Sequence, residues 1–150
     1  MIVLLILMTG LMAGIYFAFS AFIMKSLSEL PELQGAQAMN SINDVIVNTI
    51  FLPVFFGTTV WYAGLALLSL ADWQSGRSLL VVLSALIYIL GMFAVTAFGN
   101  VPLNNLLKES EGDESQLVRA WRKYLVQWTA LNHIRTISCM TSCALMIIAY

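Results

Sequence analysis

Four long apolar segments limit the folds that this chain can adopt. Residues 2–24, 45–71 and 78–107 contain no charged side chain, and a fourth apolar segment runs from about residue 131 to residue 150. A helix needs about 20 residues, at roughly 1.5 Å each, to cross the hydrocarbon core of a bilayer. Because lipid offers no partner to backbone N–H and C=O groups, such segments cross as helices. The sequence therefore predicts an all-α membrane protein, a bundle of four transmembrane helices over residues 2–24, 46–71, 79–99 and 131–150.

Composition agrees with this class and excludes others. Hydrophobic residues make up 60% of the chain and charged residues 10%, whereas about a quarter of a soluble domain is charged. A net charge of −1 argues against nucleic acid as a partner, since binding phosphates needs a basic face. At 150 residues we expect a single domain, residues 1–150. The first segment lacks the basic start of a signal peptide and is longer than its apolar region, so we expect a retained span.

Residues 115–130, just before the last span, have the pattern of an amphipathic helix. Apolar side chains recur at helical spacing and basic side chains oppose them: Leu117, Trp121, Tyr124, Leu125 and Trp128 against Arg119, Arg122 and Lys123. We expect this helix to lie in the membrane interface, with its tryptophans at headgroup depth. In the first span, Gly10 and Gly14 form a small-xxx-small pattern that predicts close approach of another helix.

Polar residues collect at one end of the predicted bundle. They stand at or before the start of the second span, at the end of the third and at the start of the fourth: Asn40, Asn43 and Asn48; Asn100 and Asn104; Asn132, His133 and Arg135. Because consecutive spans are antiparallel, all three groups reach the same leaflet. Ionisable side chains at membrane depth are costly and commonly functional. We therefore expect these groups to form an intramembrane pocket.

Each of these features also has a purely structural interpretation. Arg135 can extend its guanidinium to the headgroups, and His133 can sit at the interface. Asn100 and Asn104, with Pro102 between them, can simply end the third span or join helices by hydrogen bonds. We expect no metal site, because the chain has one histidine and its carboxylates cluster in a loop. A haem bound by His133 alone stays an alternative.

Four stretches of sequence carry a family resemblance. They are residues 14–20 (GIYFAFS), residues 39–43 (MNSIN) leading to 55–58 (FFGT), residues 99–104 (GNVPLN), and Trp121, Tyr124 and Trp128 followed by residues 132–136 (NHIRT). In order and spacing they resemble the anthrone oxygenase-like family of small integral membrane proteins, DUF1772. The best-known members of that family are fungal proteins that oxidise polyketide anthrones to anthraquinones without a metal or flavin. The resemblance implies an oxidoreductase without a cofactor. We expect the protein to lie in the bacterial inner (plasma) membrane.

The matching residues suggest a chemical hypothesis. Oxidation of an anthrone-like or quinol-like lipophilic aromatic needs a proton to leave an activated carbon. His133 is the side chain suited to that base role at neutral pH. Arg135 and Asn132 would complete the catalytic group by stabilising the oxyanion. Substrate-binding residues would be Asn100, Asn104, Trp121, Trp128, Asn43 and Asn48.

A second class of function competes with this one. The same bundle can bind a quinone or lipid without chemistry, or serve as a small subunit of a membrane complex, with the polar cluster joining helices. Homo-oligomers are left open by the sequence. A transporter is disfavoured because polar residues gather in only one leaflet and no inverted repeat is visible.

Overall fold

The computed structural model describes residues 2–150, and over that range the chain is helical without any strand. In chain order the elements are α1 (Ile2–Ala18), the π-helical turn η1 (Phe19–Ile23), α2 (Met24–Ser28), α3 (Glu32–Ile46), α4 (Phe51–Ala71), α5 (Ser75–Tyr88), the π-helical turns η2 (Ile89–Ala94) and η3 (Thr96–Asn100), α6 (Val101–Glu109), the 3-10 turn η4 (Ser110–Gly112) and α7 (Glu114–Ala149).

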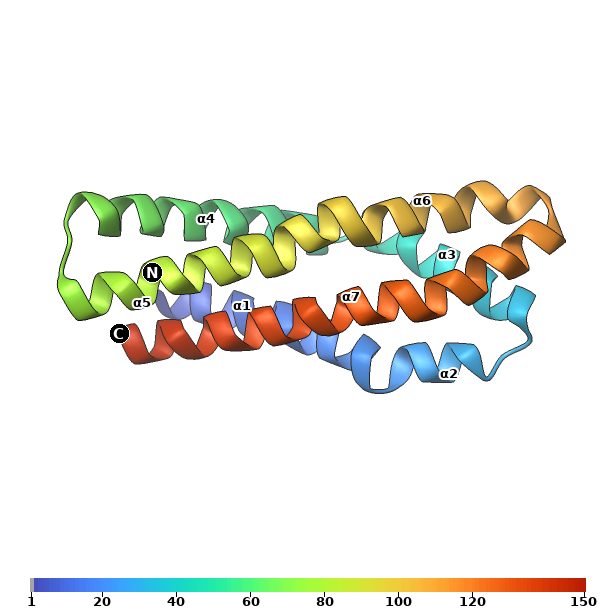
Figure 1. Ribbon diagram of the computed structural model, residues 1–150, viewed down its shortest axis with the longest axis horizontal. Coiled ribbons are helices and arrows are strands. Elements are labelled where there is room, and N and C mark those ends of the chain that lie inside the picture. Colours follow the sequence, from blue (N-terminus) through green and yellow to red (C-terminus); the bar gives the residue numbers. More distant parts are fainter. Residues whose placement is uncertain (1) are drawn as a thin grey trace.

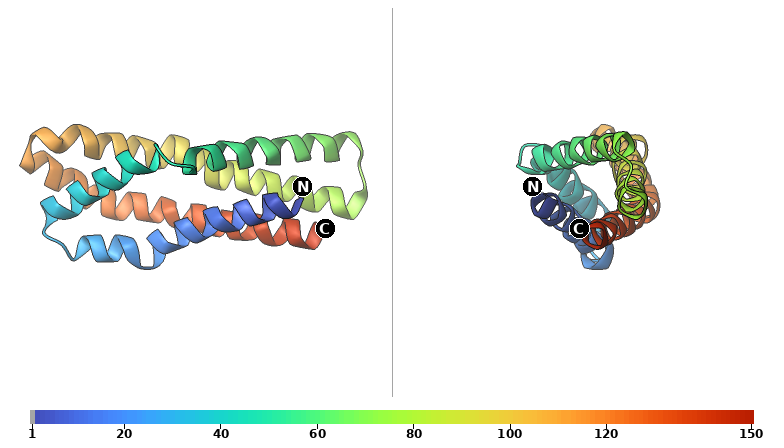
Figure 2. Two further views of the ribbon diagram at one scale, coloured as in Figure 1. Left: turned by 180° about the vertical axis from the view of Figure 1, so that it is seen from behind. Right: turned by 90° about the vertical axis from the view of Figure 1, so that its left-hand side faces the viewer.

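The predicted all-α class and the four membrane-spanning helices are confirmed. Within residues 2–150, four continuous helical stretches are long and apolar enough to cross a membrane: Ile2–Ser28, Phe51–Ala71, Ser75–Gly112 and Glu114–Ala149. They run alternately up and down, and both termini lie at the same end of an elongated bundle (Figure 1). Seen along its length, the molecule has the helices around a common axis (Figure 2).

Two of the helical stretches are much longer than a bilayer is thick. Ser75–Gly112 has 38 residues and Glu114–Ala149 has 36, which corresponds to roughly 55 Å at 1.5 Å per residue, against about 30 Å of hydrocarbon. The bundle therefore extends beyond the membrane at the end away from the termini (Figure 1). We call this extension the cap; it consists of α2, α3, α6, η4 and residues 114–127 of α7.

Two apolar cores follow one another along the bundle. The membrane core lies toward the termini and contains Leu5, Met12, Ala13, Tyr16, Phe55, Tyr62, Val81, Ala85, Tyr88, Met92, Cys139 and Met146. The cap core contains Met24, Leu27, Ala36, Met39, Leu103, Leu107, Leu117, Ala120, Trp121, Tyr124 and Trp128. The candidate functional site lies where these two cores meet.

The expected interfacial helix is the first part of α7, and this differs from the sequence prediction. Residues 115–130 continue without a break into the last span. Their apolar side chains, including Leu117 and Trp121, are buried in the cap core, while Arg122 and Lys123 stay exposed. The apolar face is therefore covered by α2, α3 and α6, where the sequence pattern predicted lipid headgroups.

Two span boundaries also differ from expectation. The second span begins at Phe51 and not at residue 46, because Asn48 N–H and Thr49 N–H close turns onto Val45 and Ile46. The third does not end at residue 99 but continues through Pro102 into α6. Proline is tolerated there because it stands in the first turn of α6, directly after the π-helical turn η3, where the regular hydrogen-bond ladder is already interrupted.

Glycines permit close helix contact, but at other positions than the sequence suggested. A Cβ atom at Gly91 would overlap Ser138 Oγ, and one at Gly99 would lie 2.8 Å from Leu131 Cδ1. Gly10 and Gly14 have no such neighbour within 4 Å among the described residues. The close approach expected at Gly10 and Gly14 is thus wrong; it occurs between the third helical stretch and α7.

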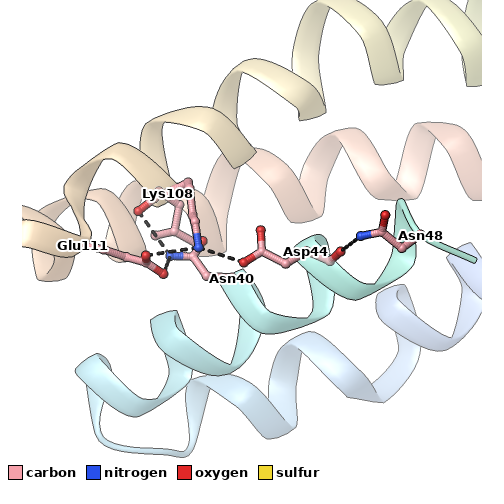
Figure 3. Close-up of polar contacts among 6 residues, drawn as sticks. Asn40, Asp44, Asn48, Lys108 and Glu111 are labelled. Atoms are coloured by element: carbon pink, nitrogen blue, oxygen red, sulfur yellow. Dashed lines mark hydrogen bonds and ion pairs between the residues drawn. The ribbon is translucent and has the colours of Figure 1, made fainter.

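Polar contacts fasten α3 to the rest of the cap. Asn40 Nδ2 donates to Glu111 Oε1 at 2.8 Å and to the Leu107 carbonyl at 3.3 Å, and Lys108 Nζ contacts Asp44 Oδ2 at 2.7 Å (Figure 3). At the other end of α3, Arg122 forms a two-pronged contact with Glu32, with distances of 2.6 and 3.0 Å. These contacts hold α3 against the other helices of the cap.

Candidate functional site

A pocket of about 220 Å³ lies between the membrane core and the cap core. It is enclosed by α1, η1, α3, the turn at Val47, α4, η2, η3, α6 and α7. Its lining is Ile15, Tyr16, Phe19, Met39, Ile42, Asn43, Ile46, Val47, Phe51, Leu52, Phe55, Phe56, Phe93, Thr96, Ala97, Asn100, Val101, Asn104, Trp128 and Arg135. Every helical stretch of the bundle therefore contributes to one site.

Aromatic rings form much of the pocket wall. Phe55 stacks between neighbours, with its centroid 6.1 Å from that of Phe51 and 5.4 Å from that of Phe93, and Phe19 meets Trp128 edge to face at 5.5 Å. An apolar cavity of about 150 Å³ is enough to bind benzene. The pocket thus suits a flat lipophilic molecule of roughly two or three fused rings.

Arg135 is the single charged side chain in the lining formed by residues 2–150, and it is only 4% exposed. Its Nη2 donates to Asn132 Oδ1 at 2.8 Å and its Nη1 to Thr96 Oγ1 at 3.4 Å, whereas Nε has no partner among the described residues. The guanidinium also lies over two rings, 4.4 Å from the centroid of Tyr16 and 4.8 Å from that of Trp128.

This buried cation has no carboxylate partner in the described part of the chain. Ion pairs among residues 2–150 join Lys108 to Asp44 and Glu111, and Arg122 to Glu32. A buried charge is costly unless it is paired, and ring contacts with two amide or hydroxyl bonds compensate only partly. The pocket is therefore electrostatically suited to an oxygen atom that carries negative charge.

Asn132 positions Arg135 but does not line the pocket. The side chain is fully buried, and its Nδ2 donates to the Tyr16 carbonyl and to Ser20 Oγ, both at 2.7 Å. Its Oδ1 accepts from Arg135. Asn132 thereby joins α7 to α1 and fixes the guanidinium at the pocket wall.

A second polar network surrounds Asn104, which lines the pocket. Its Oδ1 accepts from Tyr124 OH at 2.8 Å and from Trp128 Nε1 at 2.9 Å, and Asn43 Nδ2 donates to the same tyrosine oxygen at 3.4 Å. Because two donors hold Oδ1, the amide orientation is defined. Asn104 Nδ2 has no hydrogen-bond partner among residues 2–150 and is available to a ligand.

Asn100 belongs to the wall between these two networks. Its Nδ2 donates to the Trp128 carbonyl at 3.3 Å, and its Oδ1 is buried without a partner in residues 2–150. The sequence predicted that Asn43, Asn100, Asn104, Trp128 and Arg135 lie together, and the structure places all five in one pocket lining.

Three predicted site residues lie elsewhere. His133 is on the exposed face of α7 and does not line the pocket, because one helical residue from Asn132 turns the side chain away from the bundle. Trp121 is buried in the cap core, and Asn48 is exposed in the α3–α4 turn, where its amide donates to the Asp44 carbonyl. The role of His133 as a base stays a prediction, and the position of His133 outside the pocket lining does not support it.

Sequence reasoning missed several lining residues. Tyr16 and Thr96 contact Arg135, and Phe51, Phe55 and Phe93 build the aromatic wall. Tyr16 stands within the first family motif, which was a usable signal. Thr96 and Phe93 lie in the π-helical turns η3 and η2, and such turns recur at functional sites but are not visible in a sequence.

Metal-binding groups are not gathered anywhere in residues 2–150: no three of the His, Cys, Asp and Glu side chains come together there. Cys139 and Cys143 are free thiols. The polar chemistry of the pocket thus comes from one guanidinium, three amides, a threonine and a tyrosine of the described chain.

The fold and site together define a four-helix membrane protein with an aromatic-walled pocket and an arginine buried in its wall. A family model described as "Anthrone oxygenase" matches residues 46–145. The chain belongs to this family. The matched range contains Asn100, Asn104, Trp128 and Arg135, whereas α1 and most of α3 lie outside it. No curated protein and no solved structure matches the chain.

Proposed function

We propose that the protein is a membrane-embedded oxygenase that oxidises an anthrone-like or quinol-like lipophilic aromatic without a metal or flavin. The observation that carries this proposal is Arg135, a buried cation without a carboxylate partner among residues 2–150, in the wall of an aromatic pocket. Membership of the anthrone oxygenase family supports it.

The proposed reaction needs only the substrate and dioxygen. An anthrone-type ring methylene loses a proton to give an electron-rich anion, whose negative charge is carried largely on the ring oxygen. The anion reacts with O2. The methylene carbon then loses its second hydrogen and keeps one oxygen atom as a carbonyl, while the other oxygen atom leaves in water. Arg135 would lower the barrier by stabilising the charge that develops on the ring oxygen.

Other pocket residues would orient the substrate. Asn132 and Thr96 hold the guanidinium, and Trp128 with the phenylalanines would hold the ring system. The pocket reaches the surface at Val47, Phe56 and Val101, which line it and are 49%, 51% and 41% exposed. All three are apolar, which supports access for a lipophilic substrate from the bilayer.

The test is oxidation of a simple anthrone in membranes that contain the full-length protein, followed by quinone absorbance and O2 uptake above the spontaneous rate. Arg135→Gln should reduce the protein-dependent rate by about 100-fold or more, the cost of removing an oxyanion donor. Arg119→Gln, which removes an exposed arginine from the same helix, is the matched control and should retain the wild-type rate. Full activity in Arg135→Gln would contradict the proposal.

His133→Ala in the same assay tests the base prediction. A loss of turnover would place His133 in the mechanism despite its exposed position, and unchanged turnover would remove it. Neither result alters the prediction for Arg135, since the two side chains lie on different faces of α7.

A non-enzymatic quinone- or lipid-binding protein is the second candidate. It is favoured by one observation: among residues 2–150, Tyr16 and Arg135 are the titratable side chains in the lining, and neither is an ordinary general base at neutral pH. Mass spectrometry of small molecules that co-purify with the protein tests this candidate. A bound quinone together with no anthrone turnover would favour it. Localisation in a bacterial inner membrane and homo-oligomers stay predictions.

A further inference from the structure

We propose that the pocket binds its aromatic ligand as an anion: a ligand hydroxyl loses its proton on binding, its oxygen faces Arg135, and a second ligand oxygen faces the amide of Asn104. This inference rests on the pocket of the proposed function and deepens it by naming the substrate class. That class is a fused aromatic with an acidic hydroxyl group and a second oxygen.

The pocket wall offers two donors, the guanidinium of Arg135 and the amide of Asn104, beside two amide oxygens, those of Asn43 and Asn100, that have no partner among residues 2–150. Asn104 Oδ1 already accepts from Tyr124 and Trp128, which leaves the Nδ2 group for a ligand. Thr96 Oγ1 donates to the Met92 carbonyl at 2.7 Å and meets Arg135 only through a long 3.4 Å contact. Asn100 Oδ1 is unpaired within residues 2–150 but fully buried. The two donors, Arg135 and Asn104 Nδ2, favour a ligand that presents oxygen lone pairs to them.

The charges around Arg135 favour an anion over a neutral ligand. The titratable groups that face it are Tyr16 of α1 and Tyr124 and Cys139 of α7. The other described elements around the pocket contribute rings, amides and Thr96 but no ionisable side chain. An arginine stays protonated, and in a low-dielectric site its attraction for a nearby anion is much stronger than in water. A bound phenol or enol should therefore ionise and release its proton to water.

Geometry places both donors beside the same indole ring. Arg135 Cζ lies 4.8 Å from the Trp128 ring centroid, and Trp128 Nε1 donates to Asn104 Oδ1 at 2.9 Å. Both donors thus border the same ring, and a flat ligand in the pocket can present one oxygen to each. A fatty-acid carboxylate is another source of a negative oxygen, but the stacked phenylalanine rings and the cavity of about 220 Å³ favour a fused-ring ligand.

This mode of binding removes the need for a protein base. Over residues 2–150, the pocket lining contains no histidine or carboxylate. If the hydroxyl that ionises beside Arg135 is the enol form of the anthrone, water accepts its proton, and the bound anion is the same electron-rich species that loss of a methylene proton gives and that reacts with O2. The exposed position of His133 is then no obstacle to the proposed reaction.

The experiment titrates 2-hydroxyanthraquinone, which changes colour when its hydroxyl ionises, in the presence of the purified full-length protein in neutral detergent. The pKa of the bound dye should fall by at least about one unit relative to the dye in detergent alone, a roughly tenfold preference for the anion. Anthraquinone, which lacks the hydroxyl, should bind more weakly. Arg135→Gln should return the pKa of the dye to its value in detergent alone, and Arg119→Gln should give the same pKa as the wild-type protein.

Asn104→Asp provides a second variant whose fold should be retained. It keeps an oxygen for Tyr124 and Trp128 but replaces the free donor by an acceptor, so it should raise the pKa of the bound dye above the wild-type value. An unshifted or raised pKa in the wild-type protein overturns the inference. Binding of oleate, with no displacement by the dye, also overturns it.

The dye has no oxidisable methylene, so its binding and the oxidation of an anthrone are independent results. If the dye binds in its neutral form while anthrone turnover continues, this inference fails and the proposed function stands. If the dye ionises in an Arg135-dependent way without anthrone turnover, the anion site stands and the proposed function fails.

Discussion

At the scale of single residues, the Asn132 side chain forms more hydrogen bonds than any of the polar side chains that line the pocket. It bonds the Tyr16 carbonyl of α1 and Ser20 of η1 and also holds Arg135 on its own helix. The contacts with Tyr16 and Arg135 are buried, and the contact with Ser20 is partly buried; an unmade hydrogen bond is costly in such a site. The asparagine thus links helix packing to the position of the charge.

Asn132→Ala should therefore destabilise the protein by about 1–3 kcal/mol, the usual cost of leaving buried polar partners unsatisfied. Unfolding in mixed detergent, followed by circular dichroism, measures this. Asn48→Ala is the matched control because Asn48 is exposed and its side chain bonds only the Asp44 carbonyl among residues 2–150; it should change stability by less than about 0.5 kcal/mol. Equal stabilities for the two variants would refute the central role of Asn132.

The sequence was sufficient to bring the pocket amides, Trp128 and Arg135 together, but not to orient every side chain. Antiparallel connectivity determines which polar groups share a leaflet. The inward face of α7 depends on helix rotation, and consecutive residues differ by about 100°. His133, next to Asn132, therefore faces outward while Arg135 faces the pocket. A single sequence cannot decide between neighbours of equal polarity.

At the scale of elements, the π-helical turns determine which side chains line the pocket. Phe19 lies in η1, Phe93 in η2, and Thr96 and Asn100 in η3, and all four line the pocket. An extra residue in a turn rotates the next stretch of helix relative to a regular α-helix. The hydrophobic pattern predicted four spans, though not all of their boundaries, and contains no signal for these turns, so Thr96 could not be assigned to the site in advance.

A substitution at Gly91 tests how closely these turns approach α7. Gly91→Ala should destabilise the fold by about 1–3 kcal/mol, because the added methyl group would lie 2.6 Å from Ser138 Cβ, which side-chain rotation does not move, so that relief requires a shift of packed helices. Gly10→Ala adds the same group where no atom of the described residues lies within 4 Å, so it should be neutral or slightly stabilising. Detergent unfolding of both variants gives the comparison, and an equal effect would contradict the close contact.

The start of α7 gives a pH prediction. Hydrogen bonds from the Ser115 hydroxyl, and then from the backbone and side chain of Gln116, lower the pKa of the Asp113 carboxyl from 3.8 to about 2. Because the folded pKa is lowered, the stabilisation is fully present above pH 3.8 and is lost as the pH falls toward 2. Asp113→Asn retains a good N-cap without a charge.

Melting temperature measured between about pH 2 and pH 6 tests this assignment. The wild-type protein should lose stability toward pH 2 more steeply than Asp113→Asn, and the two curves should run parallel above about pH 4. Glu32 also has a lowered pKa, caused by its hydrogen bond with Arg122, so both proteins should keep a residual slope. Identical curves over the whole range would remove Asp113 as the cause.

At the scale of the whole molecule, the length of the bundle places the pocket. A span of about 20 residues counted from the end with the termini reaches the level of Trp128 to Arg135 on α7 and of Phe51 on α4. The pocket then lies at the edge of the hydrocarbon, beneath the cap. At that depth the ligand of our proposal would enter from the bilayer, with its ionised oxygen and the released proton close to water.

This placement predicts a sharp difference in accessibility between the two halves of the bundle. Gln37 on α3 and Val60 on α4 are both exposed side chains, Val60 to 71%. In lipid nanodiscs, where both membrane faces are open, Gln37→Cys should react with a charged maleimide, whereas Val60→Cys should react at least about tenfold more slowly because lipid covers it. The wild-type protein, whose Cys139 is buried and Cys143 partly buried, supplies the background rate. Equal labelling of both variants would mean that α4 is not embedded at Val60, and the pocket would then open to water rather than to lipid.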